Sequence, residues 1–486
     1  MALMSSSFRA RRVLSTGRLG SFTRSALFST KPEGGRASAA VSHSKTESKK
    51  GKGEKFDLAP PRGTRDFFPE DHRVKSWLFN NFREIAHRYG FEEYDAPVVE
   101  SEELYIRKAG EEVTQQLYNF EDKGGRRLSL RPEMTPSLAR MVLSRKNALP
   151  MPLKWFAIPQ CWRYERMTRG RRREHYQWNM DIWGVEGVEA EAEILSAAVA
   201  SMKNMGITSQ DVGIKINSRK ILTELMTKYG IPEENWASTC VLIDKLEKVS
   251  IDAIMDDLLS LGLTKEVVTN LVENLQIKSL EEFAEKLGND SEGVKDLKEL
   301  FDLAEGYGFA EWLVFDASVV RGLAYYTGIV FEGFDKSGEL RAIFGGGRYD
   351  KLLESMGGDA LPAVGFGFGD AVIIELLNSK NLVPDLSKNC VDVMLYAKDS
   401  RAKKNTLSTA TQLRESGLSV DVVLQNKKPK WVFQRADKSG VSAVVLIDYD
   451  DESESIKASI KTLATGEQFD CALSEVKKNI DDILNV

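Results

Sequence analysis

Trp162-Arg-Tyr-Glu-Arg-Met-Thr-Arg-Gly-Arg-Arg-Arg173 is a run of twelve residues that carries six arginines and one glutamate. Arginine stays charged and can place two N–H donors on one phosphate, so the run predicts contact with a triphosphate or an RNA backbone. A run of charges is more often only a solvated surface. Aromatic residues flank this one on both sides, which favours a loop held in place against an anion: Trp162, Tyr164, Tyr176, Trp178 and Trp183.

The neighbouring segments predict the elements that hold this loop. Apolar runs at Trp155–Ile158 and Trp178–Trp183 are typical of strands, so the basic run becomes the loop of a long hairpin. Segments with the three-and-four spacing of an amphipathic helix are Arg73–Tyr89, Glu189–Met205, Arg219–Tyr229 and, as a helical insertion, about 232–306.

Glycine clusters mark a second region of interest. Strands are predicted at Ile329–Phe334 and Leu340–Phe344, then come Gly345–Gly347 before Arg348, and Gly365, Gly367 and Gly369 open a helix. Neither a P-loop GxxxxGK[ST] nor a GxGxxG after the first strand occurs, so a nucleotide site of those types is excluded. Residues 319–328 hold an arginine and two tyrosines between glycines. They are interpreted as a polar pocket wall or, equally, as a strand edge.

The C-terminal region alternates strands and helices, which predicts a small, partly parallel α/β domain. Its basic residues gather around Trp431 and Phe433: Lys427, Lys428, Lys430, Arg435 and Lys438. Aromatic rings stack on unpaired bases while cations hold phosphates, so the cluster is interpreted as an RNA-binding surface. On this segment alone, a solvated helix with a buried Trp431 explains the pattern equally well.

The first 30 residues contain five arginines, seven serines and no acidic residue. This composition is typical of an organellar transit peptide, with a disordered basic tail as the alternative. A Gly/Ser/Lys/Glu-rich linker follows. The predicted organisation is therefore a transit peptide and linker at 1–55, a core at 56–385 with the helical insertion inside it, and the α/β domain at 390–486.

Composition excludes several classes of protein. The chain of 486 residues has 67 Lys plus Arg against 72 Asp plus Glu, a net charge of −5, so it is no polyanion binder that relies on a global field. The four cysteines and four histidines are scattered without a CxxC pair, which argues against a disulfide framework or a zinc site. The sequence contains no run of about 18 apolar residues, so it predicts no transmembrane helix.

Four peptides, in this order, resemble those of the histidyl-tRNA synthetase family: Pro61-Arg-Gly-Thr-Arg-Asp-Phe-Phe-Pro69, Leu130-Arg-Pro-Glu-Met-Thr135, Trp162-Arg-Tyr-Glu165 and Arg321-Gly-Leu-Ala-Tyr-Tyr326. The resemblance runs from about residue 60 to the end. It implies a class II α+β core, an antiparallel sheet flanked by helices, that is homodimeric through the segment containing Pro97. It also implies that the C-terminal α/β domain binds the anticodon.

The same resemblance implies the activity and its ligands. L-histidine is activated with ATP to histidyl-adenylate, with Mg²⁺ bridging the phosphates, and is then transferred to the 3′ end of tRNA(His). With the transit peptide, this activity belongs in mitochondria, plastids or both, and no membrane partner is expected.

Individual residues take roles from the resemblance. Arg163 and Arg321 are expected as the catalytic cations on opposite sides of the α-phosphate. The histidine pocket comprises Glu133, Thr135 and Gln177 at the α-amino group, Asp181 and Tyr326 at the two imidazole nitrogens, and Met134, Arg321 and Tyr325 beside them. ATP is assigned to Arg163, Glu165, Arg171 and Arg173, with Glu165 reading the adenine amino group or supporting the loop. The tRNA is assigned to Lys428, Lys430 and Arg435.

One position departs from the family pattern. Class II motif 3 ends Gly-x-Gly-x-Glu-Arg, where the arginine binds the γ-phosphate, and Val372 stands at that arginine's place. The cation is missing or comes from Arg341, Arg348 or the basic run. This keeps a second function open, a non-catalytic, histidine-sensing regulatory paralogue of the synthetase fold. The anticodon domain and the retained Arg163 and Arg321 favour the enzyme, and a general RNA-binding protein leaves the amino-acid pocket unexplained.

Overall fold

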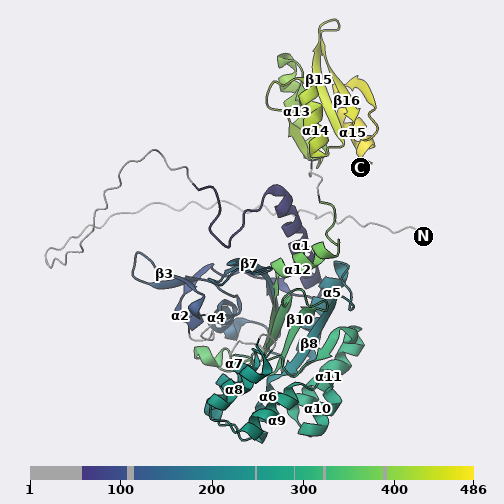
Figure 1. Cartoon of the computed structure of the whole chain (residues 1–486). Helices are drawn as coiled ribbons and strands as arrows, with labels where there is room; N and C mark the ends of the chain where they lie inside the picture. The colour runs from purple at the N-terminus through teal and green to yellow at the C-terminus, as the bar shows by residue number, and fades with distance from the viewer. Residues whose placement is uncertain are drawn as a thin grey trace, which may run out of the picture. The chain divides into compact units, whose positions relative to one another are not determined.

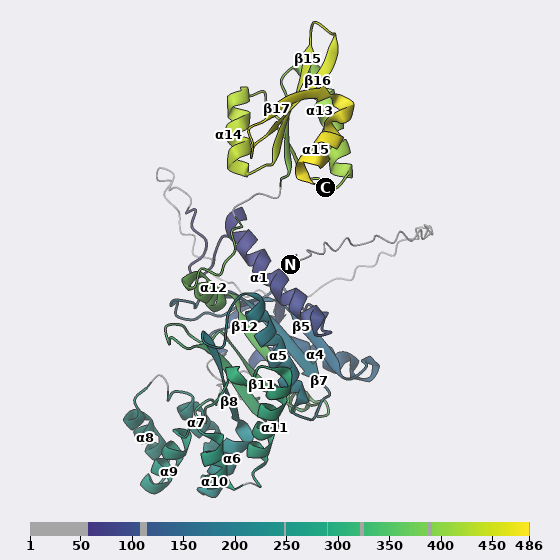
Figure 2. The same cartoon turned by 90° about the vertical axis from the view of Figure 1, so that its right-hand side faces the viewer.

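The computed structural model describes residues 57–106, 114–246, 249–288, 290–320, 325–386 and 391–485. The predicted transit peptide and Arg321 lie outside these residues. The part that precedes residue 386 and the C-terminal part each have their own sheet and core, and each is described by itself (Figures 1 and 2).

A nine-stranded sheet, counted over the described residues, organises the larger part (Figure 1). Its order is β1-β5-β7-β12-β11-β10-β8-β9, with β6 paired to β7. Neighbours are antiparallel except β1 with β5 and β8 with β9, which are parallel pairs at the two edges. The α+β class is confirmed, and the sheet is mixed at its edges. The strands are β1 Glu92–Glu93, β5 Leu153–Ala157, β6 Gln160–Trp162, β7 Glu174–Trp183, β8 Val212–Ser218, β9 Leu313–Phe315, β10 Ile329–Asp335, β11 Phe344–Arg348 and β12 Ala363–Gly369.

The predicted hairpin around the basic run is present. β6 ends at Trp162 and pairs with the start of β7, and Thr168 and Arg171 exchange backbone hydrogen bonds of 3.2 and 3.0 Å inside the loop. Both ends of the basic run are therefore fixed by sheet pairing.

The strand predicted at Leu340–Phe344 is wrong in position. β11 begins only at Phe344 and contains Gly345–Gly347. Glycine is a poor strand former, but β11 is bonded to β10 on one side and β12 on the other, so the backbone ladder compensates for the missing side chains.

The Gly-Phe alternation of β12 separates the two faces of the sheet. Successive side chains of a strand point to opposite faces. Phe366 and Phe368 enter the core, where Trp178 stacks on Phe82 with ring centroids 4.7 Å apart. The glycines of β12 lie on the other face, which is thereby left without side chains at those positions.

Helices cover the aromatic face of the sheet. α1 (Pro69–Arg88) and α5 (Glu189–Asn204) pack against each other and against β7, and α11 (Glu292–Tyr307) packs beside α5 (Figure 2). α4 (Thr135–Arg145) follows a small antiparallel sheet of order β2-β4-β3, and α12 (Asp370–Ser379) follows β12. The small sheet and its helix comprise β2 Val99–Ser101, α2 Glu103–Ile106, β3 Tyr118–Glu121 and β4 Arg127–Leu130.

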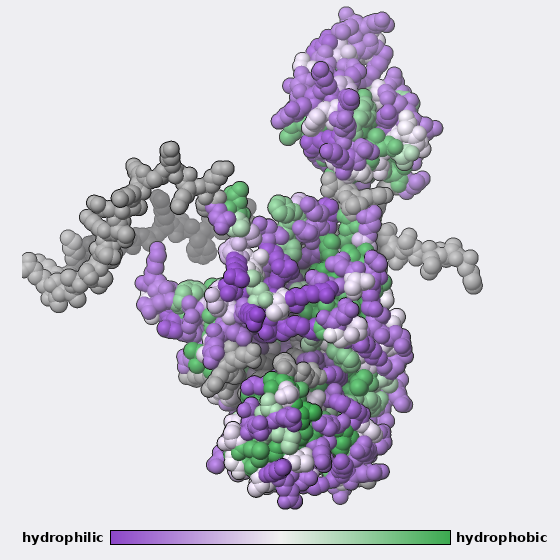
Figure 3. Space-filling model, in the orientation of Figure 1, coloured by the Kyte–Doolittle hydropathy of each residue, from purple (hydrophilic) through white to green (hydrophobic). Residues whose placement is uncertain are grey.

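A group of short helices lies at one end of the central sheet (Figure 1). They are α6 Arg219–Lys228, α7 Glu233–Ile243, α8 Ile251–Ser260, α9 Lys265–Leu275 and α10 Leu280–Leu287. Ser250, Thr264 and Ser279 cap α8, α9 and α10 through their side-chain oxygens. Figure 3 shows apolar surface in this region, where Val241 and Leu259 are exposed.

The C-terminal part has a five-stranded sheet of order β14-β13-β15-β16-β17. β13 is parallel to β14 and β15, and the remaining pairs are antiparallel, which agrees with the predicted partly parallel α/β arrangement. α13 and α15 pack on one face and α14 on the other (Figure 2). The elements are β13 Val393–Ala397, α13 Lys403–Glu415, β14 Val420–Val422, α14 Pro429–Ser439, β15 Ala443–Asp450, β16 Ser455–Thr462, β17 Gln468–Ala472 and α15 Val476–Leu484.

Short 3₁₀ turns complete the chain: Lys146–Ala148, Ala310–Trp312, Glu354–Met356, Ser400–Ala402 and Leu473–Glu475. In the described part of the chain, no helix has both the length and the apolar composition needed to cross a bilayer.

Candidate active site

A cavity of about 340 Å³ opens on the glycine face of the central sheet. Strands β7, β11 and β12 form its floor, and the basic loop, the turn before β11 and the first turn of α12 form its walls. It brings together eight of the predicted site residues: Glu133, Thr135, Arg163, Glu165, Arg171, Gln177, Tyr325 and Tyr326.

The register between β7 and β12 creates the floor. Gly365 lies opposite Asp181, Gly367 opposite Asn179 and Gly369 opposite Gln177. A Cβ at Gly365 would lie 2.1 Å from Asp181 Oδ1, and one at Gly367 would lie 3.2 Å from the Gln177 amide. The polar side chains of β7 can therefore occupy this face only because β12 contributes none.

Asp181 is the most deeply buried of the predicted acidic site residues, with 1% of its surface exposed. It lies beside Gly365 and Tyr349, which line the cavity, and the Tyr349 hydroxyl donates a hydrogen bond to Oδ1. Oδ2 has no hydrogen-bond partner among the described residues. Burial raises the pKa of Asp181 to about 7, against the opposing effect of the Tyr349 hydrogen bond. One oxygen of this carboxyl is thus left for a ligand.

Glu133 is a second buried acid with one free oxygen. The Tyr325 hydroxyl donates to Oε2 at 3.2 Å, while Oε1 has no hydrogen-bond partner in the described part of the chain. Burial raises the pKa of Glu133, and the positive charge of Arg163 opposes that rise. The Glu133 carboxylate can bind an ammonium group, and the neighbouring Arg163 guanidinium can bind a negatively charged group of the same ligand or of a second one.

The basic loop carries its charges on an ordered backbone. Arg163 donates from Nε to the Pro132 carbonyl at 3.0 Å, which leaves its two terminal nitrogens for the cavity. Arg171 pairs with Glu165 at 2.6 Å, so Glu165 supports the loop. The backbone N–H of Arg163 donates to the Arg173 carbonyl at 2.9 Å, which closes the base of the loop.

Three predicted pocket residues do not line the cavity: Asp181, which lies behind Gly365 and Tyr349, Arg173 and Met134. The Arg173 guanidinium lies over the Tyr164 ring at 3.7 Å, outside the cavity wall. The Met134 side chain is fully buried and packs with Ala96 and Ala157. These side chains support the walls in this structure, and Arg321 lies outside the described residues.

Sequence reasoning missed several residues that line the cavity. His175 and Asn179 lie on the same face of β7 as Gln177, two residues to either side, so the alternation of a strand was the signal for both. Burial lowers the pKa of His175 to about 3, with nearby arginines adding to the effect, so its ring is neutral. Tyr349 was not singled out because nothing in the sequence pairs it with Asp181.

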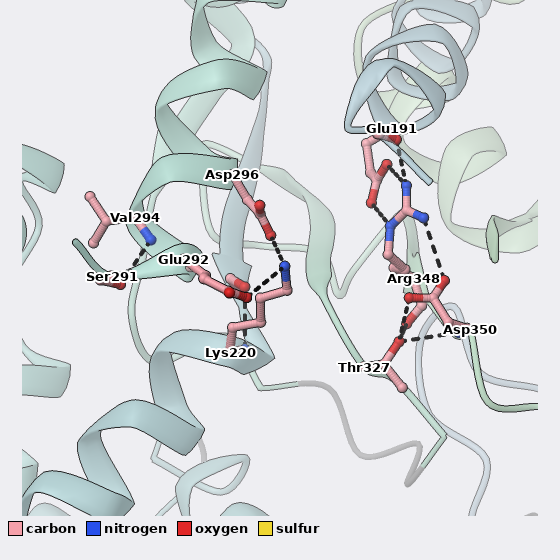
Figure 4. A network of polar contacts seen from close by, with 12 residues as sticks. Glu191, Lys220, Ser291, Glu292, Val294, Asp296, Thr327, Arg348 and Asp350 are labelled. Atoms are coloured by element: carbon pink, nitrogen blue, oxygen red, sulfur yellow. Dashed lines mark hydrogen bonds and ion pairs between the residues drawn. The ribbon is translucent and has the colours of Figure 1, made fainter. Parts of the chain in front are cut away.

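Arg348, one of three candidates for the missing phosphate cation, is occupied elsewhere. It is buried and makes two hydrogen bonds to Glu191, at 2.6 and 2.5 Å (Figure 4). Two more go to the carbonyls of Val185 and Gly187. Figure 4 also shows Asp350 between Arg348 and Thr327. Because Thr327 follows Tyr326, this network positions the tyrosine wall of the cavity and is not available to phosphate.

A further contact ties the peptide Pro61–Pro69 to the cavity. Arg65 pairs with Asp370 at 3.0 Å and with Glu174 at 3.3 Å. Asp370 also accepts a hydrogen bond from the Tyr176 backbone N–H at 3.0 Å. Arg65 therefore joins β7 to the start of α12.

The predicted tRNA residues are exposed on the C-terminal part. Lys428 and Lys430 flank Pro429 at the start of α14, and Arg435 pairs with Asp421 at 2.7 Å. Trp431 is 38% exposed, with Lys427 and Arg435 over its ring at 5.5 and 5.6 Å. A buried Trp431, the alternative left open by the sequence, is not what the structure has.

Two family models match the chain. The one described as Histidyl-tRNA synthetase matches residues 63–370, and the one described as Anticodon binding domain matches residues 389–483. A curated relative, "Histidine--tRNA ligase, chloroplastic/mitochondrial" of Arabidopsis thaliana, is 53% identical over 444 residues, covering 91% of this chain and 90% of the relative. "Histidine--tRNA ligase" of Opitutus terrae is 36% identical over 429 residues, covering 87% and 98%.

Solved structures agree with these matches. The crystal structure of histidyl-tRNA synthetase from Nostoc sp. is similar with a TM-score of 0.70 at 25% identity, over 88% of this chain and 100% of that chain.

Proposed function

Because the chain belongs to the histidyl-tRNA synthetase family, we propose that it activates L-histidine with ATP and transfers it to the 3′ end of tRNA(His). The observation that carries the proposal is one cavity in which arginines of the basic loop lie with Glu133, a buried acid with an unpaired oxygen, while a second such acid, Asp181, lies directly behind the cavity wall. That combination suits a negatively charged triphosphate together with a zwitterionic amino acid.

The first step is an in-line substitution at phosphorus. An oxygen of the histidine carboxylate forms a bond to the α-phosphorus of ATP, the bond to the bridging oxygen breaks, and pyrophosphate leaves with that electron pair. Such a reaction needs positioning and charge neutralisation more than a protein nucleophile. Arg163 neutralises the α-phosphate. Arg321, the cation expected on the opposite side, lies outside the described residues.

The cavity also supplies groups that recognise histidine. Glu133, Thr135 and Gln177 take the α-amino group. Asp181 and Tyr326 take the two imidazole nitrogens, since a neutral ring offers one donor and one acceptor. An analogue without either nitrogen leaves a buried polar group unpaired, which discriminates strongly.

In the second step, a ribose hydroxyl at the 3′ end of tRNA(His) attacks the carbonyl carbon of histidyl-adenylate. The ester bond forms, the bond between the carbonyl carbon and the phosphate oxygen breaks, AMP leaves with that electron pair, and the hydroxyl proton passes to the leaving phosphate or to water. The domain organisation proposed for this sequence of steps is a core at 56–385, with its helical insertion at about 232–306, and an anticodon-binding domain at 390–486.

Mg²⁺ enters with ATP in this proposal. Over the described residues, no group of three His, Cys, Asp or Glu side chains is arranged to hold a metal ion. Mg²⁺ is commonly held by substrate phosphates, water and one or two carboxylates. In this proposal the ion reaches the site bound to the phosphates of ATP.

The test is histidine-dependent exchange of labelled pyrophosphate into ATP by the purified chain. Exchange with histidine and not with other amino acids is expected. Histidine binding without exchange would instead identify a regulatory paralogue. That alternative is not favoured, because the chain matches an anticodon-binding model and ligases over most of its length.

The homodimer is proposed from the exposed apolar side chains near Pro97. Val98 and Val99 are exposed, as are Ile106 and Phe120 on neighbouring elements of the small sheet. Sedimentation equilibrium should give twice the 54.4 kDa mass of one chain, less any cleaved leader. A mass of one chain at micromolar concentration would contradict this proposal.

Residues 1–55 are proposed to direct the protein into mitochondria, plastids or both. Their arginine- and serine-rich composition without acids in the first 30 residues and the organellar relative support this proposal. A fluorescent reporter carrying residues 1–55 should enter these organelles. The same reporter with the five arginines of residues 1–30 replaced by glutamine should stay in the cytosol, and cytosolic fluorescence from both fusions would refute the assignment.

Replacing Lys428, Lys430 and Arg435 by alanine should weaken tRNA charging and leave histidyl-adenylate formation unchanged. These side chains are exposed around Trp431, where they can hold phosphates while the ring stacks on a base. Charging should also depend less on salt in the variant, because phosphate contacts release counterions. The matched control replaces Lys403, Lys404 and Lys478, which are exposed on α13 and α15. An equal loss in both half-reactions would argue against a surface that contacts only RNA.

A further inference from the structure

Arg341 lies in the turn between β10 and β11, directly beside the start of α12. β11 pairs with β12 up to Phe344 and Phe368, and the Gly369 backbone N–H then donates to the Ile343 carbonyl at 3.2 Å. Two residues before Ile343, Arg341 therefore lies next to the first turn of α12. Arg341 and Val372 both line the cavity.

Four arginines line this cavity, but they are not equally engaged. Arg163 donates to a backbone carbonyl and Arg171 pairs with Glu165. Arg341 has no carboxylate within ion-pair distance among the described residues. Burial lowers its pKa, and the nearby Arg171 lowers it further. Arg341 is exposed, and Glu165 and Glu332 partly offset the repulsion from Arg171 and Arg163. Its guanidinium is therefore open to an anion, and the proposed substrate supplies one.

The first turn of α12 does not provide this charge. Val372 packs against the basic loop, since a Cβ at Gly170 would lie 3.2 Å from Val372 Cγ2. Arg348 is bound to Glu191 and is therefore excluded. Arg172, the fourth arginine of the cavity, is exposed like Arg341 and follows the turn that Thr168 and Arg171 close, so the test below includes it as the alternative.

We propose that Arg341 binds the terminal phosphates of ATP, so that a strand turn provides the cation that α12 lacks. This inference rests on the proposed function and adds one residue to it. Arg341 contacts the pyrophosphate part of the substrate, whereas Arg163 faces the α-phosphate. The two guanidiniums thus bind different parts of one triphosphate.

Arg341→Ala should raise the KM for ATP in pyrophosphate exchange by about 10- to 100-fold, the effect of losing one hydrogen bond to a charged group. The KM for histidine should stay within twofold. Inhibition by AMP should also be unchanged, because AMP lacks the phosphates in question. Arg341→Lys should be intermediate, since a single ammonium cannot replace a planar fork.

The variant Arg341→Ala with Val372→Arg supplies the cation from α12 instead and should recover most of the ATP affinity. The matched control is Arg169→Ala, whose guanidinium is 59% exposed and pairs with Glu375 outside the cavity. If Arg341→Ala fails to fold, as judged by thermal unfolding, Arg341→Gln is used in its place.

An unchanged KM for ATP in the folded variant would overturn the inference, as would equal weakening of ATP and AMP. A larger effect of Arg172→Ala on the KM for ATP would overturn it as well, by assigning the role to the loop. No histidine-dependent exchange by the parent protein would instead refute the proposed function. The two failures are therefore distinguishable.

Discussion

Arg163→Ala is expected to lower the rate of histidine-dependent pyrophosphate exchange by about 10²–10³, the usual effect of removing one preorganised donor from a developing negative charge. Arg163 is fixed in place before substrate arrives, because its Nε is already bonded to the Pro132 carbonyl. The loss should appear in kcat at saturating ATP and histidine. Direct binding of histidine, measured by calorimetry, should change little.

Two variants test the reason for this effect. Arg163→Lys keeps a charge but loses the fork and the Pro132 hydrogen bond, so it should recover only part of the rate. Arg166→Ala removes an exposed arginine of the same loop that does not line the cavity, and it should exchange at the parent rate. If Arg163→Ala exchanges at near the parent rate, Arg163 is not the catalytic cation.

Asp181→Asn should stabilise the protein at neutral and alkaline pH while weakening histidine binding by about 10- to 100-fold. The carboxyl is buried with one oxygen unpaired, which is unfavourable for the charged form until a ligand arrives. Asparagine keeps an oxygen for the Tyr349 hydroxyl but replaces the second acceptor by a donor. A ring N–H of histidine then meets N–H and not a carboxylate oxygen.

The stability effect has a defined pH window. The pKa of Asp181 is about 7 in the folded protein and 3.8 as the ordinary value, so the neutral carboxyl favours folding below pH 3.8. That contribution is lost as pH rises towards 7 and amounts to on the order of 4 kcal/mol. The difference in the free energy of unfolding between Asp181→Asn and the parent should grow by on the order of 2–3 kcal/mol from pH 5 to pH 8.

Denaturant unfolding of both proteins at several pH values measures this difference, and it should stay constant above pH 8. Asp359→Asn is the matched control, because its side chain is 94% exposed and should give no such pH dependence. A parent protein that is at least as stable as Asp181→Asn at pH 8 would show that the carboxyl is not strained by its burial.

The spacing of apolar residues in the sequence predicted most of the helices and strands around the site. Helical spacing gave α1 over Arg73–Tyr89, where the structure has Pro69–Arg88, and the apolar runs around the basic segment gave the β5–β7 hairpin. These features are local, because a stripe of apolar side chains depends only on residues a few positions apart. The resemblance added the residues now gathered around the cavity, whose individual roles stay predictions.

What the sequence could not provide is long-range pairing. The Tyr349–Asp181 hydrogen bond and the Arg348–Glu191 ion pair join residues more than 150 positions apart. Strand propensity predicted the strand before β11 because glycine is a poor strand former. The three glycines of β11 form a strand because β10 and β12 are bonded to it on both sides. Arg341 was one of several candidates until the register of β11 and β12 put its turn beside α12.

The bare face of β12 restricts how the pocket can change during evolution. Every replacement of Gly365 adds at least a Cβ, and that atom would occupy space now held by Asp181 Oδ1. Substitutions of the β12 glycines can therefore only reduce the volume available to the ligand and cannot increase it. A shift to a different amino acid must come from β7, where Gln177 and Asp181 can be exchanged for larger or smaller groups without changing the floor.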